Sequence, residues 1–171
     1  DNPSLVETFK QYTQNEFSLD TMIDDLEVVC NSYSDGYHYI DYEFSRDFCD
    51  NYEDAVDKWL DVLKKRDQYS LAFRFLLKAY EVFYKLDIED NGGETVALSV
   101  IIISQWANII MCMDDLERLE AFVELGQYLN SMRDYYDSQK IIEIFFDLNT
   151  HIPQVIIKIG NDSFNFLGFY V

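Results

Sequence analysis

Proline and glycine are scarce in this chain of 171 residues, which contains only two prolines and six glycines. Loop-rich and many-stranded β folds need these residues for their turns, so the scarcity argues against both classes. The composition also excludes a disordered chain, because apolar residues make up 49% of the sequence and aromatic residues 16%. The length suits a single domain over residues 1–171, with a core large enough to fold without disulfides or metals.

Residues that carry common active-site chemistry are also few. The three cysteines, Cys30, Cys49 and Cys112, lack C-x-x-C spacing, which argues against a disulfide framework and a zinc site. We therefore expect reduced, buried thiols in a cytoplasmic protein. His38 and His151 lie in no recognisable motif, and the sequence has no Gly-rich phosphate loop, H-E-x-x-H or EF-hand spacing. These absences predict a protein that is not an enzyme and that holds no metal or cofactor.

Basic residues are strongly outnumbered, because 13 Lys and Arg stand against 32 Asp and Glu, a formal net charge of −19. Such a chain repels the phosphates of nucleic acids and the headgroups of anionic membranes. Direct binding to nucleic acid or to a membrane is therefore not expected. A protein partner of this chain is expected to be basic.

Charge is missing altogether from the 18 residues Val96–Met113, a length at the lower limit for a membrane span. The stretch contains four polar residues, Ser99, Ser104, Gln105 and Asn108, and acidic residues follow it directly. We interpret it as the central core helix of a soluble fold rather than as a span. No signal peptide is visible, and the lack of an initial Met is compatible with a removed leader.

Apolar residues recur at the i, i+3, i+4 spacing of a helix almost from end to end. The capping box Ser4-x-x-Glu7 predicts the start of a first helix, and a second begins after Ser18. Helix 70–86 is apolar nearly all round, which predicts a place inside a bundle. We therefore expect an all-α fold, a compact bundle of about seven helices around an apolar central helix. The later predicted helices cover residues 44–65, 70–86, 95–113, 115–132 and 134–149.

Three segments interrupt the helical pattern. Residues 34–36 end the second helix, and Gly36 is expected to supply the positive φ of a turn or cap. Residues 37–42 are either extended or a loop, and 87–93 form the clearest loop. Residues 154–171 form either a short C-terminal hairpin or a final packed segment.

The acidic residues are concentrated in one part of the chain. Between Glu16 and Asp61, fourteen acidic residues face only two bases, Arg46 and Lys58. At about 100° per residue, acids of two helices each fall in one narrow strip, opposite apolar residues that include Trp59. The strip of the second helix holds Asp20, Asp24 and Glu27, and the strip of the third holds Asp50, Asp54, Asp57 and Asp61.

Three interpretations of these strips stay open. They are either solvated faces of amphipathic helices or a surface complementary to a basic partner, which would speed association through long-range attraction. A divalent-metal site on Asp50, Asp54 and Asp57 is the weakest of the three, because one helical strip rarely converges on an ion. Tyr37 and Tyr39 lie among acids between the two helices and either belong to the partner surface or pack over helix ends.

The segment Tyr33-Ser-Asp-Gly-Tyr37 closes a helix and leads into an acidic helix that contains Tyr52 and Trp59. An aromatic- and leucine-rich run, Tyr69–Tyr80, and an acidic stretch, Asp114–Leu125, follow it. Together these stretches resemble the helical immunity proteins that are paired with polymorphic nuclease effectors. The resemblance covers about residues 5–148, and the chain departs from the family pattern in its shorter length and in the spacing expanded by residues 87–93.

The resemblance implies an all-helical, non-enzymatic bacterial protein that binds and blocks a secreted DNase toxin. A toxin that binds DNA exposes basic surface, and the acid strips suit that role independently. The alternative is a helical signalling adaptor with a Bcl-2-like arrangement, in which an apolar groove holds a partner helix. Steep salt dependence of partner binding would favour the inhibitor, and weak dependence would favour the adaptor.

Overall fold

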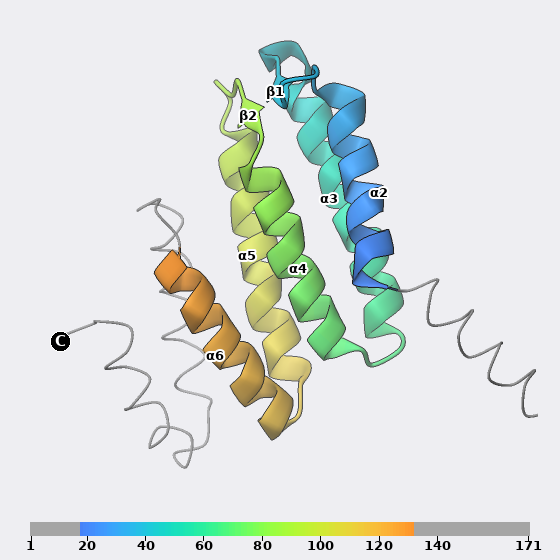
Figure 1. Cartoon of the computed structure of the whole chain (residues 1–171), viewed down its shortest axis with the longest axis vertical. Helices are drawn as coiled ribbons and strands as arrows, with labels where there is room; N and C mark the ends of the chain where they lie inside the picture. The colour runs from blue at the N-terminus through green and yellow to red at the C-terminus, as the bar shows by residue number, and fades with distance from the viewer. Residues whose placement is uncertain (1–17, 132–171) are drawn as a thin grey trace, which may run out of the picture. The chain divides into compact units, whose positions relative to one another are not determined.

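The computed structural model describes residues 18–131, which contain five helices and two short strands (Figure 1). The chain divides into two compact units at the Leu98–Ser99 bond. In chain order, the elements are α2 (Leu19–Tyr33), β1 (Tyr39–Ile40), α3 (Tyr42–Lys64), α4 (Tyr69–Tyr84), β2 (Asp87–Ile88), α5 (Glu94–Cys112) and α6 (Asp115–Ser131).

The mostly helical character that periodicity predicts is confirmed. The predicted first helix, the helix over 134–149, the segment 154–171 and His151 lie outside the described residues. A total of seven helices, a central helix and a single domain therefore stay predictions.

Polar caps decide where the first two helices begin. Ser18 Oγ accepts a hydrogen bond from the Thr21 backbone N–H at 3.2 Å, so α2 starts where the sequence predicts. The carboxylate of Asp41 accepts one from the Glu43 N–H at 3.1 Å. Because Asp41 supplies this cap, α3 begins two residues earlier than the predicted start at Phe44.

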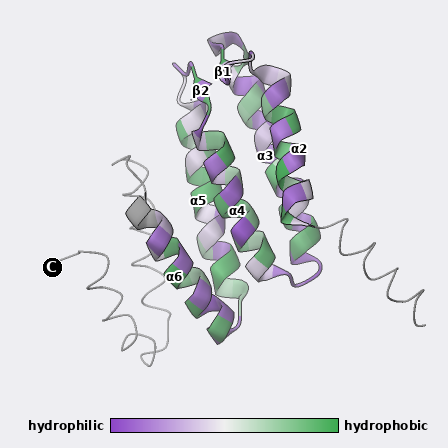
Figure 2. Ribbon diagram, in the orientation of Figure 1, coloured by the Kyte–Doolittle hydropathy of each residue, from purple (hydrophilic) through white to green (hydrophobic). Residues whose placement is uncertain are grey.

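In the first unit, α2, α3 and α4 contact one another pairwise and alternate in direction (Figure 1). Figure 2 shows hydrophobic and hydrophilic residues on different sides of α2 and α3, as amphipathic helices require. Aromatic rings form part of the core, since Phe48 lies 5.5 Å from Tyr52 and 6.5 Å from Phe83, centroid to centroid. The buried Tyr52 hydroxyl donates to the Ala79 carbonyl at 2.7 Å, which satisfies its polar end and ties α3 to α4.

Helix α4 is less enclosed than predicted. It buries eight residues, but Arg74, Lys78 and Tyr84 are exposed. The long charged side chains of Arg74 and Lys78 are four residues apart, so they mark one solvent-facing line along a mainly apolar helix. Lys78 Nζ also pairs with the Glu81 carboxylate at 2.7 Å on this side.

Two-residue strands lie at one end of the three helices. β1 pairs in parallel with β2, with Tyr39 opposite Asp87 and Ile40 opposite Ile88 (Figure 1). The segment 37–42 is thus partly extended, and the predicted loop 87–93 begins with a strand.

The expectation that Gly36 supplies the positive φ is wrong, because His38 adopts it, with φ of 62°. The Asp35 carboxylate accepts hydrogen bonds from the backbone N–H groups of Tyr37 and Tyr39. The Asp35 side chain thus forms an Asx turn that closes the loop. The left-handed conformation falls on His38, two positions after Gly36.

In the second unit, Arg118 joins the start of α6 to the end of α5. Its guanidinium donates to the carbonyls of Ile110 at 3.3 Å and Met113 at 2.7 Å, and the Ile110 carbonyl also accepts from the Met113 N–H at 3.2 Å, so these helix-end acceptors are satisfied. The Asp114 carboxylate accepts from the N–H groups of Leu116 and Glu117, as expected of an acid that begins a helix.

Helix α5 is, within the described part of the chain, the helix long and apolar enough to cross a membrane, with a mean hydropathy of 1.8. Length and composition are weak evidence here, because the core helix of a soluble protein meets the same criteria. In the structure, 39% of the stretch is buried. Its interpretation as a core helix stays a prediction. The buried side chains between Leu98 and Ile110 are Leu98, Ser99, Ile102, Ile103, Trp106, Ile109 and Ile110.

Candidate partner-binding surface

The α3 acid strip, defined as Asp50, Asp54, Asp57 and Asp61, faces solvent, and all four residues are exposed. The side of α3 opposite the strip is buried in the core, as the helical wheel predicts, and it includes Trp59. The strip is therefore an uninterrupted exposed line of carboxylates along α3. The residues opposite it are Phe48, Tyr52, Val56, Trp59 and Leu63, which are buried, and Ala55, which is half-buried.

Glu53 lies beside this strip, and the negative charges of the strip affect the pKa of its carboxyl group. Partial burial and repulsion from Asp57, Asp50 and Asp54 raise the pKa of the Glu53 carboxyl. Like charges four residues apart each destabilise an exposed helix by about 0.2–0.5 kcal/mol. The negative charge concentrated on α3 therefore lowers the stability of the helix.

The α2 acid strip, defined as Asp20, Asp24 and Glu27, is exposed as well, but it faces away from α3. The α2 acid that faces α3 is Asp25, whose Oδ2 accepts from Trp59 Nε1 at 3.0 Å. Asp25 lies on one flank of the buried stripe of α2, and the α2 acid strip lies on the other flank, about 130° away from Asp25 on average. The structure thus keeps the two predicted strips on separate surfaces.

Lys58 is one of the two bases in the acidic region, and its side chain contacts α2. Its Nζ lies 4.0 Å from Asp25 Oδ2 and 5.6 Å from the centroid of the Trp59 ring. These contacts join α2 to α3 at the side of the strip, where the lysine is shared with an acid from another helix.

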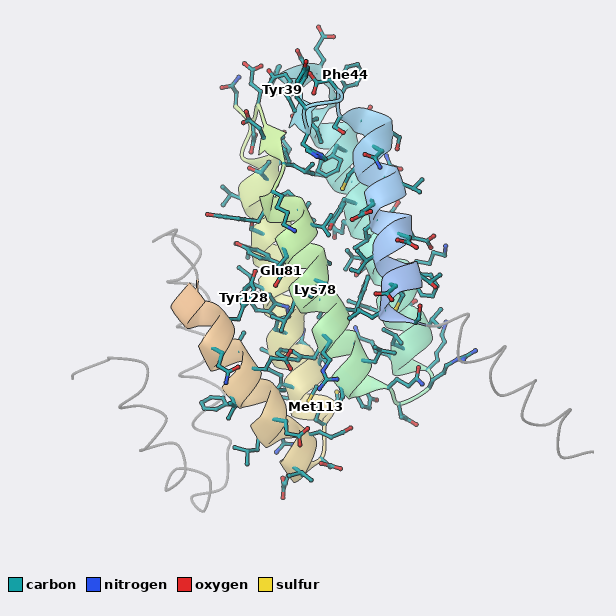
Figure 3. The ribbon with its side chains drawn as sticks, in the orientation of Figure 1. Tyr39, Phe44, Lys78, Glu81, Met113 and Tyr128 are labelled. Atoms are coloured by element: carbon teal, nitrogen blue, oxygen red, sulfur yellow. The ribbon has the colours of Figure 1, made fainter. Side chains whose placement is uncertain are left out.

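The tyrosines between α2 and α3 have different surroundings. Tyr37 is exposed, whereas Tyr39 is half-buried and its hydroxyl donates to the Glu89 carboxylate at 2.7 Å (Figure 3). That hydrogen bond, with burial and the neighbouring acids, raises the pKa of Tyr39 to about 12. Tyr33 packs edge-on against Phe48, with centroids 5.9 Å apart, so it covers the end of a helix.

Sequence reasoning missed a second acidic segment that folding brings to the same place. Pairing of β1 with β2 carries the residues 87–94 to the end of the bundle where α3 begins. Burial raises the pKa of the Cys49 thiol on α3 to about 12, and the charges of Asp90 and Glu94 add to this effect. The signal was visible as four acids within eight residues, but nothing in the local sequence shows the pairing across fifty residues. These acids are Asp87, Glu89, Asp90 and Glu94.

Asp90 has a structural function in this segment. Its carboxylate accepts hydrogen bonds from the N–H groups of Gly92, Gly93 and Thr95 and from the Thr95 hydroxyl, which caps the start of α5. Partial burial opposes ionisation, but the bonds from Thr95 and Gly93 outweigh it and hold the pKa of Asp90 well below its usual range. Within residues 18–131, no group of three or more His, Cys, Asp or Glu side chains is placed to hold a metal ion.

The cysteines differ in exposure, and the expectation that all three are buried is wrong for Cys112. Cys112 is the last residue of α5, where the helix surface turns to solvent. Cys30 and Cys49 are buried, and burial raises the pKa of each thiol to about 12.

A thiol-specific disulfide reagent at pH 8 should therefore label one cysteine rapidly in the folded protein. A pKa of about 12 lowers the thiolate fraction about 10³-fold or more relative to an ordinary free cysteine, so Cys30 and Cys49 should react mainly after unfolding. The absorbance of the thiolate that the reagent releases measures the rate at which each cysteine is labelled. Cys112→Ser should remove the rapid phase, and two rapid phases in the folded wild type would contradict the burial described here.

Comparisons of the chain with protein-family models, with curated proteins and with solved structures find no match.

Proposed function

We propose that this protein is a non-enzymatic inhibitor of the immunity type, which binds and blocks a basic, DNase-type bacterial toxin in the cytoplasm. The α3 acid strip is the binding surface, on a bundle of about seven helices around α5. The observation that carries the proposal is the exposed line of four carboxylates on α3, together with the raised pKa of Glu53 beside it. A surface that repels itself favours binding to a cationic partner, which removes that repulsion.

The strip has a charge spacing suited to a DNA-binding site. Asp50 and Asp61 are eleven residues apart, so four charges follow the helix axis at about one per 5.5 Å. One strand of DNA carries one charge per about 3.4 Å, a spacing of the same order. Basic residues that hold phosphates would therefore meet carboxylates at comparable intervals. Inhibition then needs only occupation of the nucleic-acid site, with no chemical step.

Capture and release by salt test this function. The full chain, immobilised and incubated with extract of its native host at low salt, should retain a basic protein that high salt elutes. The eluted protein should cleave plasmid DNA, and an equimolar amount of this chain should stop the cleavage. A partner that is retained equally well at high salt and has no nuclease activity would instead support the adaptor with an apolar groove.

A further inference from the structure

Exposed aromatic rings gather in one short segment of the first unit. Nine large hydrophobic side chains are exposed in the described part of the chain, and three of them lie within the eight residues 37–44. Tyr37 is 88% exposed, Tyr42 is 51% exposed and Phe44 is 50% exposed. Such a concentration of accessible rings is typical of recognition surfaces rather than of ordinary helix ends.

The backbone that carries these rings is held in place by polar contacts. The N–H of Tyr37 donates to Asp35 Oδ1 at 2.9 Å, and the Asp35 N–H donates to the Tyr39 carbonyl at 3.0 Å. Phe44 lies in the first turn of α3, and its N–H donates to the Asp41 carbonyl at 2.9 Å (Figure 3). The rings are therefore presented on a segment whose conformation the structure already defines.

Carboxylates surround the same segment. We call residues 35–47 and 85–94 the strand end, because β1 and β2 pair there. The strand end contains eight acidic residues and only two bases, Arg46 and Lys85. The Tyr39 hydroxyl donates to Glu89, and Asp41 and Asp87 are close enough to raise the pKa of Tyr39 further. The eight acids are Asp35, Asp41, Glu43, Asp47, Asp87, Glu89, Asp90 and Glu94.

We propose that the strand end binds an arginine-rich segment of the basic partner, with guanidinium groups stacked on the rings of Tyr37 and Phe44 and paired with the neighbouring carboxylates. The inference rests on the proposed function, because it requires a basic partner. Aromatic faces beside carboxylates favour arginine over lysine, since the guanidinium is planar, weakly hydrated and able to stack and pair at once. Tyr37 and Phe44 are seven residues apart in the chain, so a segment with several arginines fits better than a single side chain.

The test uses two peptides of equal charge, hexa-arginine and hexa-lysine, titrated into the ¹⁵N-labelled full chain. Hexa-arginine should bind about fivefold or more tightly than hexa-lysine and should shift the amide resonances of 37–44 and 87–89 most. Tyr37→Ala with Phe44→Ala should weaken hexa-arginine binding about tenfold and hexa-lysine binding about twofold or less. Tyr37→Phe, which keeps the ring, should bind as wild type does. Val28→Ala removes an exposed apolar side chain on α2 and is the matched control, with no change expected.

Equal affinities for the two peptides, with resonance shifts spread over every acidic surface, would overturn the inference and leave only a general charge effect. So would unchanged hexa-arginine affinity in the Tyr37, Phe44 double variant. The proposed function fails by a different result, because it is tested by nuclease inhibition and by charge reversal on α3. Suppose that the protein inhibits the nuclease and that the double variant binds hexa-arginine as wild type does. The strand end would then be rejected as the arginine-binding site, and the proposed function would stand.

Discussion

Reversal of three charges on α3, with Asp50→Lys, Asp54→Lys and Asp57→Lys in one variant, should weaken binding to the basic partner about 100-fold or more, equivalent to about 3 kcal/mol. The partner's basic side chains would then meet three like charges instead of three opposite ones. The loss should appear in the association rate at low salt, because long-range attraction raises that rate most. Association and dissociation rates measured over a range of salt concentrations would show it.

The fold should survive this change. All three positions are exposed, and exposed substitutions usually alter the free energy of unfolding by less than about 0.5 kcal/mol each. The introduced cations repel one another as the three carboxylates did, but they neighbour the carboxylates of Glu53 and Asp61, so the net effect on α3 should be small. An unchanged thermal transition, followed by circular dichroism, is the condition for interpreting the binding data.

The matched control reverses the α2 acid strip, with Asp20→Lys, Asp24→Lys and Glu27→Lys. The change in net charge is the same, but these side chains face away from α3. Only the long-range part of the attraction should be lost, so association should slow by less than about tenfold. If the α3 variant inhibits the nuclease as well as wild type does, the strip is only a solvated face of an amphipathic helix.

Trp106→Ala should destabilise the protein by about 3–5 kcal/mol, because a large buried ring is removed and a cavity remains. Trp106 is 0% exposed, and its ring packs edge-on against Tyr128 at 5.8 Å between centroids. In a urea titration followed by circular dichroism, the unfolding midpoint should fall by roughly 2 M. Trp106→Phe keeps an apolar ring and should lose less than half as much.

The substitution also leaves a single tryptophan as a reporter. The sequence has two, so the fluorescence of Trp106→Ala comes only from Trp59 on α3. Comparison of that signal with circular dichroism separates unfolding of the first unit from loss of helix elsewhere. A variant that unfolds at the same urea concentration as wild type would show that burial of Trp106 does not stabilise the fold.

Within residues 18–131, local sequence was sufficient to predict the helices and most of their limits. Ser18 and Asp114 cap helices because a short side-chain oxygen satisfies backbone N–H groups within the next turn, a contact that needs no tertiary structure. The exposed and buried sides of α3 also follow from sequence, because period-3.6 spacing places Asp54 and Trp59 on different sides of one helix. The acid strip of α3 was therefore visible before any fold was known.

Relations between elements were decided only by the tertiary structure. Whether the strips of α2 and α3 share a surface depends on which flank of α2 packs against α3, and the contact of Asp25 with Trp59 decides it. The acids of 87–94 join the start of α3 because β1 and β2 pair, a contact between residues nearly fifty positions apart. Periodicity describes one helix at a time, because it follows from the geometry of a single backbone. The shared surface follows from packing, in which the burial of side chains from several segments sets their mutual orientation.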